Sequence, residues 1–125
     1  MPIEVQSDGE KLIFRDYLNR KVTILHEDYF DLMASPERRV IRPALEDCLS
    51  NPSEVWWTFE TIEGKEYSYY KYLKVYRDLV FIAVVLMDDF LHFNLNNFYG
   101  YDENEAVLAE NDRCGQLILS NLKSE

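Results

Sequence analysis

The sequence predicts an α+β fold with an N-terminal hairpin and two helices, then a four-stranded antiparallel sheet and a C-terminal helical segment. A change in the spacing of apolar residues along the chain leads to this prediction. Apolar residues recur at helical spacing between positions 26 and 50, and they alternate with polar residues from position 53 onward. The chain has 125 residues, of which 47% are hydrophobic, and this suits a single domain spanning residues 1–125 around one core.

The first element is a hairpin. Residues 11–17 and 22–25 both alternate between apolar and polar side chains, and Asn19 and Arg20 lie between the two runs. A short polar link between two alternating runs is typical of two strands joined by a tight turn.

Two short helices are predicted next. Residues 26–35 carry apolar side chains at helical spacing and acidic residues in the first turns, where the helix dipole favours negative charge. Residues 36–52 place their apolar side chains in one stripe. Pro43 lies inside this second helix, so it either opens the regular part or kinks a longer helix.

Four strands follow, separated by short turns. They are EVWWTFETI (54–62), KEYSYYKYLKVY (65–76), LVFIAVVLM (79–87) and FLHFNLNNFYG (90–100). The third strand is apolar throughout, so we expect both faces of the sheet to be covered, by helices or by a second subunit. The tail, residues 103–123, returns to helical spacing and is interrupted at Gly115.

Charge and composition restrict the function. Thirteen basic and 23 acidic residues give a net charge of −10, which repels a polyanion from most of the surface. The N-terminus has no signal pattern, and the longest apolar run, residues 79–87, is too short to span a bilayer. We therefore expect a cytoplasmic protein without a membrane partner. Cys48 and Cys114 form no metal-binding motif, so neither a metal nor another cofactor is predicted.

A basic, tyrosine-rich strip contrasts with the acidic chain. Residues 65–77 hold five tyrosines and four basic residues, among them Lys71, Lys74 and Arg77, against one acidic residue. One interpretation is structural, because tyrosine is a strong strand former and lysine protects sheet edges. The other is functional, because cations beside flat aromatic rings bind single-stranded nucleic acid.

A histidine offers a second candidate. His26 lies where the second strand meets the first helix. Histidine can carry a proton near neutral pH, although a histidine at such a junction can also simply cap or pack.

Several segments resemble a known family of nucleases. These are VTILHEDYFDLM (22–33), IRPALEDCLSNPSEVW (41–56), YYKYLK (69–74), VFIAVVL (80–86) and an arginine near a final glycine, Arg113 and Gly115. Together they resemble the phage-associated branch of the barnase, EndoU, colicin and RelE-like nuclease fold, over about residues 22–119. The resemblance implies a compact α+β domain with helices first and a curved antiparallel sheet after them. It also implies ribonuclease activity for some members.

The resemblance also assigns roles to residues. His26, Tyr70 and Lys71 match the histidine, tyrosine and lysine of the family, which predicts a phage- or plasmid-related, toxin-like endoribonuclease that needs no metal. His26 is then the proton carrier, Lys71 stabilises the charge at phosphorus, and Tyr70 orients the phosphate or acts as the acid. Lys74 and Arg77 are expected to hold flanking phosphates of RNA.

An alternative function uses the same fold without catalysis. A strongly acidic surface attracts a basic protein partner, and an apolar sheet favours a homo-oligomer. The sequence alone therefore leaves two functions open, an endoribonuclease and an inactive protein-interaction domain.

Overall fold

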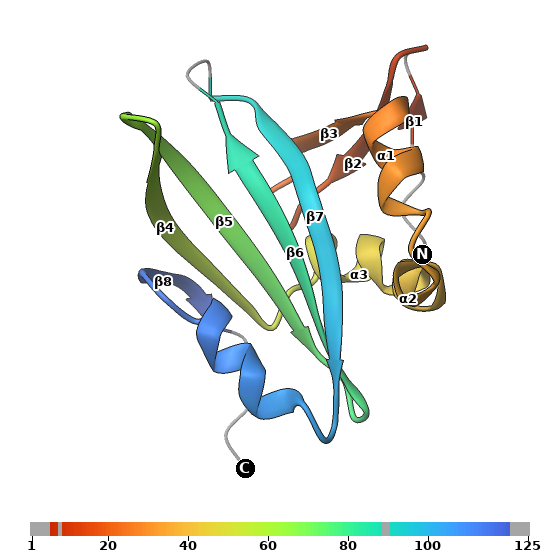
Figure 1. The fold of residues 1–125 in the computed structure, drawn as a ribbon, viewed down its shortest axis with the longest axis vertical. Helices are drawn as coiled ribbons and strands as arrows, with labels where there is room; N and C mark the ends of the chain where they lie inside the picture. The colour runs from red at the N-terminus through yellow and green to blue at the C-terminus, as the bar shows by residue number, and fades with distance from the viewer. Residues whose placement is uncertain (1–5, 8, 89–90, 121–125) are drawn as a thin grey trace.

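The computed structural model describes residues 6–7, 9–88 and 91–120. Within these ranges, eight strands form one sheet in the order β1-β2-β3-β7-β6-β5-β4-β8 (Figure 1). The strands are β1 (Gln6–Ser7), β2 (Lys11–Arg15), β3 (Lys21–Leu25), β4 (Glu54–Ile62), β5 (Lys65–Val75), β6 (Leu79–Met87), β7 (Phe93–Asp102) and β8 (Gln116–Ser120). The helices are α1 (His26–Leu32), α2 (Pro36–Ile41) and α3 (Leu45–Ser50), with the 3-10 helices η1 (Arg42–Ala44) and η2 (Ala106–Asp112).

The predicted fold class was wrong in its architecture, because the sheet is larger than four strands and its pairing is mixed. The expected meander is present as β4 to β7. However, β3 of the N-terminal hairpin pairs in parallel with β7 through Val22 with Phe93 and Thr23 with Asn94. At the other edge, β8 pairs with β4. A meander leaves unpaired N–H and C=O groups along both of its edges, and the hairpin and the C-terminal run satisfy them.

The predicted C-terminal helical segment was wrong in its second half. Residues 106–112 form η2, but residues 116–120 form β8, antiparallel to β4. Five residues are too few for periodicity to separate helix from strand, so pairing with the edge of β4 decides their conformation.

The predicted second helix is divided into three pieces. Ser35 caps α2, because its side chain accepts a hydrogen bond from the backbone N–H of Arg38. Pro43 lies at the start of η1, where its missing N–H costs no helical hydrogen bond, and α3 then continues the chain from Leu45. The proline therefore opens a short 3-10 segment that separates α2 from α3.

Apolar side chains cover both faces of the central strand β6. On one face, Leu45, Cys48 and Leu49 of α3 pack with the hairpin and the sheet, and all three are 0% exposed. On the other face, Ile82 packs with Ala109 of η2. The expectation that both faces are covered is confirmed: the helices and the hairpin cover one face, and η2 covers part of the other. Within the described residues, no helix is long and apolar enough to cross a bilayer.

The turn of the N-terminal hairpin is built around one buried carboxylate. The Asp16 side chain accepts hydrogen bonds from the backbone N–H groups of Leu18 and Arg20, from the Arg20 guanidinium and from the Tyr72 hydroxyl. The last contact ties the hairpin to β5, 56 residues away in the chain. Asp16 therefore fixes how the hairpin lies across the sheet.

Gly115 allows the chain to pass from η2 into β8. Its φ is +87°, and a Cβ there would lie 2.0 Å from the backbone oxygen of Trp57. We expect Gly115→Ala to cost more than about 1 kcal/mol of stability, because strain and a backbone clash add together. Hydrogen exchange should become faster at the amides of residues 116–120.

Gly64→Ala is the matched control for this variant. Gly64 has a φ of +79°, but a Cβ there meets nothing within 4 Å. It therefore adds similar backbone strain without the clash. Equal destabilisation by the two variants would show that contact with β4 does not constrain Gly115.

Candidate active site on the sheet

Two of the predicted site residues lie on opposite faces of the sheet. Tyr70 faces the helices, where its ring packs edge-on against Phe93 at 5.4 Å between centroids. Lys71 faces the other way, and its Nζ lies 3.1 Å from a carboxylate oxygen of Asp112. Successive side chains of a strand alternate between faces, so β5 cannot bring this pair to one substrate atom.

The other three predicted residues lie in three further places. Lys74 donates to the backbone oxygen of Asn51 at 2.7 Å, close to the end of α3. Arg77 follows β5 and lines an apolar hollow with residues of α2 and η1. His26 begins α1 and lines a hollow with Glu10, Leu25 and Glu27. The structure therefore does not gather the five residues into one cleft.

A different set of side chains meets at Lys71. Asp112, at the end of η2, accepts hydrogen bonds from the Lys71 ammonium and from the hydroxyls of Tyr99 and Tyr101 on β7. We call these four residues the Lys71 cluster. The lysine and aspartate side chains are 16% and 6% exposed, so the pair is largely buried and the lysine is its more exposed member. The cluster combines a cation, a carboxylate and two phenols on the sheet face opposite the three helices.

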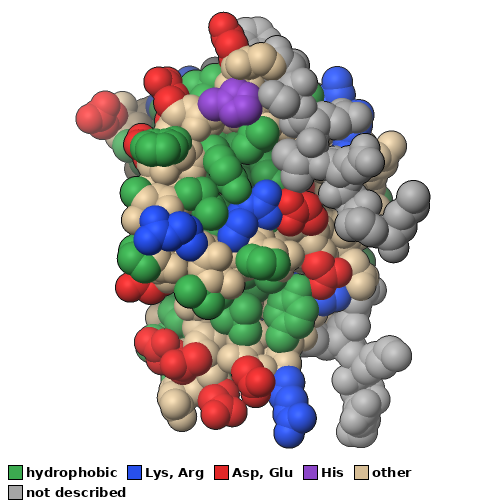
Figure 2. Space-filling model, turned by 90° about the vertical axis from the view of Figure 1, so that its right-hand side faces the viewer, with side chains coloured by type: hydrophobic (Ala, Val, Ile, Leu, Met, Phe, Trp, Pro, Cys, Tyr) green, Lys and Arg blue, Asp and Glu red, His purple; other side chains and the backbone are tan. Residues whose placement is uncertain are grey.

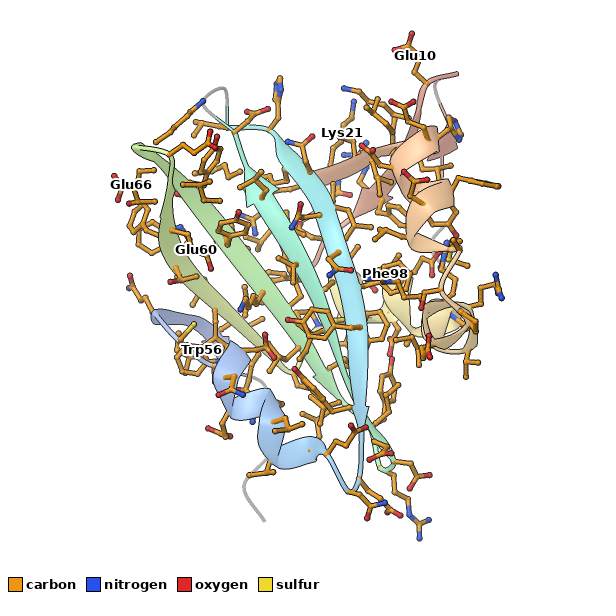
Figure 3. The ribbon with its side chains drawn as sticks, in the orientation of Figure 1. Glu10, Lys21, Trp56, Glu60, Glu66 and Phe98 are labelled. Atoms are coloured by element: carbon orange, nitrogen blue, oxygen red, sulfur yellow. The ribbon has the colours of Figure 1, made fainter. Side chains whose placement is uncertain are left out.

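A second ion pair borders the cluster. Arg113 contacts the Glu54 carboxylate through Nε and Nη2, with N to O distances of 3.0–3.1 Å. The Trp56 indole donates to the same carboxylate at 3.0 Å, and Trp56 is the residue paired with Lys71 across β4 and β5. Figure 3 shows Trp56 where β4 lies next to β8 and η2. Two cations and two carboxylates therefore lie close together where η2 meets the sheet.

The pKa values of the cluster tyrosines are raised. Burial is the main cause at Tyr99, and its hydrogen bond to the negative Asp112 adds to it. Burial also raises the pKa of Tyr101, with the Asp112 charge as the second cause. Both phenols therefore stay protonated well into alkaline solution.

Raised tyrosine pKa values predict a loss of stability at high pH. In the unfolded chain a tyrosine ionises near pH 10, so stabilisation by Tyr99 should be complete below about pH 10 and lost as the pH rises further. Urea unfolding between about pH 8 and pH 11.5 measures this decline. Tyr99→Phe should make the decline shallower. An unchanged slope in that variant would contradict the role given to burial and Asp112.

The sequence alone could not identify most of this cluster. Asp112 lies 41 residues from Lys71, in a stretch whose pattern predicts helix, so nothing local links the two. Tyr99 lies on the last predicted strand, but that prediction ends at Gly100, and only the longer β7 (Phe93–Asp102) places Tyr101 on the same face. The sequence singles out Arg113 only through the resemblance to the nuclease family, and it lies beside the cluster on Glu54.

Fold and cluster together define a class of protein, an α+β domain with ionisable side chains on a sheet. The family described as phage-Barnase-EndoU-ColicinE5/D-RelE like nuclease2 matches residues 2–118. This match covers most of the 125 residues, so the chain belongs to that family and is a nuclease-like domain. The resemblance found in the sequence is thereby confirmed. No curated protein and no solved structure gives a match.

Proposed function

We propose that this protein is an endoribonuclease that cleaves RNA at the Lys71 cluster without a metal ion. One observation carries the proposal: a lysine, a carboxylate and two phenols are in hydrogen-bond contact on the sheet of a nuclease-like domain. Cleavage of RNA by its own 2′-hydroxyl needs a base, an acid and a cation, and the cluster contains all three.

The proton transfers can be assigned within the cluster. Asp112 takes the proton of the 2′-hydroxyl, and the 2′-oxygen then forms a bond to phosphorus. The bond from phosphorus to the 5′-oxygen breaks, and the leaving oxygen takes a proton from Tyr99 or Tyr101. Lys71 stabilises the extra negative charge on the phosphorus oxygens during the exchange. The products are a 2′,3′-cyclic phosphate and a 5′-hydroxyl.

These roles differ from those that the sequence predicts. Lys71 keeps its role. Tyr70 is replaced by Tyr99 or Tyr101 as the acid, because Tyr70 faces the helices. Asp112 takes the place of His26 because it contacts Lys71 directly.

The test is incubation of the pure protein with mixed RNA in an excess of chelator. We expect cleavage that ends in 2′,3′-cyclic phosphates. A Lys71→Ala preparation, purified in parallel, controls for contaminating nucleases. Intact RNA at high protein concentration, or equal cleavage by both preparations, would contradict the proposal. With RNA as the proposed substrate, we also propose that the protein acts in the cytoplasm.

A second candidate function is an inactive interaction domain, and the pairing of the charges favours it. Lys71 and Arg113 each contact a carboxylate of the same chain, so part of their charge is already balanced. The side formed by α1 and α2 shows apolar patches between charges of both signs (Figure 2), and Val40 of α2 is 79% exposed. This function predicts intact RNA, together with a homo-oligomer or a complex in light scattering.

A further inference from the structure

A groove lies where β3 separates from β7. The two strands pair only at Val22 with Phe93 and at Thr23 with Asn94, and β3 then diverges from the sheet. Two hollows of about 320 and 560 Å³ open at this point, and both are lined by Lys11, Thr23 and Asn94. We call these two neighbouring hollows together the β3–β7 groove.

The groove is basic although the chain is acidic. Lys11, Arg20 and Lys21 line its larger part, together with His92 and a single acidic residue, Asp88. Lys21 is exposed, and Figure 3 shows it on β3 beside the upper end of β7. Arg20 is paired with Asp16, so Lys11 and Lys21 give the hollow its positive sign, in a protein with a net charge of −10.

Arg20 lines this groove, and one of its guanidinium N–H donors is buried without a hydrogen-bond partner in the described part of the chain. Arg20 contacts Asp16 through Nε at 2.8 Å, but its buried Nη2 has no hydrogen-bond partner among the described residues. The guanidinium also lies 4.6 Å from the centre of the Phe93 ring, which holds it in place. Because Nη2 itself is buried, Arg20 shapes the wall of the hollow, and the two lysines present the positive charge to a ligand.

The Thr23 and Asn94 side chains of the groove lie on the same face of the sheet as the Lys71 cluster, whereas Arg20 packs on the rings of Phe93 and Tyr70 at the opposite face. Asn94 pairs with Leu86 on β6, and Leu86 pairs with Tyr69 on β5, two residues before Lys71. Side chains two residues apart on a strand share a face. With neighbouring strands about 4.8 Å apart, Asn94 and Tyr69 are separated by roughly 10 Å, and Lys71 is about 7 Å further along β5.

We infer that the β3–β7 groove binds the sugar-phosphate backbone of single-stranded RNA next to the scissile bond, which deepens the proposed function and rests on it. The lysines contact phosphates. The Thr23 hydroxyl donates to the Asn94 side chain over a long 3.4 Å, and it can donate to a 2′-oxygen of RNA instead. Tyr69 lies between the groove and the cluster and offers a ring on which a base can stack.

The test measures binding of a short single-stranded 2′-O-methyl RNA, which cannot be cleaved, by fluorescence anisotropy at several salt concentrations. The double variant Lys11→Glu with Lys21→Glu should bind at least about 10-fold more weakly. The slope of log affinity against log salt should fall by about 1.4, since each phosphate contact on a single strand contributes about 0.7.

Two controls make the result specific. Arg39→Glu changes one charge on α2, where Arg39 contacts the end of α1, and it should leave the salt slope unchanged. Single-stranded DNA of the same sequence should bind more weakly than the RNA analogue. An equal loss of slope in Arg39→Glu, an unchanged slope in the double variant, or equal binding of DNA would each overturn the inference.

This experiment separates the groove from catalysis. The analogue could bind in a way that depends on Lys11 and Lys21 while RNA stays intact in the chelator assay. That result would reject the proposed cleavage but support RNA binding in the groove. The double variant could cleave RNA at the normal rate and bind the analogue unchanged. That result would reject RNA binding in the groove but support cleavage at the Lys71 cluster.

Discussion

Asp16→Ala is expected to lower the free energy of unfolding by about 3 kcal/mol, because it leaves buried partners unsatisfied. The Asp16 side chain is 0% exposed, whereas the Arg20 side chain is 30% exposed. Because water can partly solvate the arginine after the carboxylate is removed, the loss of stability should lie at the low end of the range for a broken buried ion pair. The Tyr72 hydroxyl and the Arg20 guanidinium would each lose an acceptor at 2.8 Å. Urea unfolding followed by circular dichroism measures the change.

Tyr72→Phe is the matched control for this carboxylate. It removes one hydrogen bond, and the two backbone N–H groups and Arg20 still satisfy Asp16, so the loss should be only about 1 kcal/mol. If Asp16→Ala cost no more than Tyr72→Phe, the carboxylate would not be the group that holds the hairpin turn on the sheet.

Lys71→Ala is expected to lower kcat/KM for RNA by roughly 10²–10³, by analogy with the loss of one group that stabilises charge in the transition state. Single-turnover cleavage of a labelled oligonucleotide in chelator measures the effect. Asp112 keeps its hydrogen bonds from Tyr99 and Tyr101 in this variant, so η2 should stay docked on the sheet.

Lys71→Arg separates charge from folding in this experiment. Arginine keeps the positive charge beside Asp112, so this variant should retain more activity than Lys71→Ala while both unfold at similar urea concentrations. Loss of activity that simply follows loss of stability across the two variants would argue that Lys71 only fastens η2 to the sheet.

Local patterns were sufficient for the elements that depend on alternation and spacing. The hairpin around Asn19 and three strands of the meander follow from a period of two, and β6 follows from its short apolar run between two turns. What the patterns could not supply was pairing between distant segments. The parallel contact of Thr23 with Asn94 and the pairing of β8 with β4 depend on which edges remain open after the meander forms.

The candidate site was predictable only in part, for the same reason. Lys71 was visible as a cation in a tyrosine-rich strand, and strand alternation already placed Tyr70 on the other face. Its partner Asp112 depends on η2 folding back over the sheet, which local spacing cannot show. Arg20 lay in the predicted turn, and only the tertiary fold reveals that it lines a basic groove.

The location of bound RNA is the most direct test of this account. Amide chemical shifts measured by NMR, with the uncleavable 2′-O-methyl RNA added stepwise, report the residues that the strand contacts. We predict the largest shifts at Lys71, Tyr99 and Asp112, continuing to Asn94 and Lys21 in the groove. Shifts confined to α2 and α3, or no shifts at saturating RNA, would contradict a site on this face of the sheet.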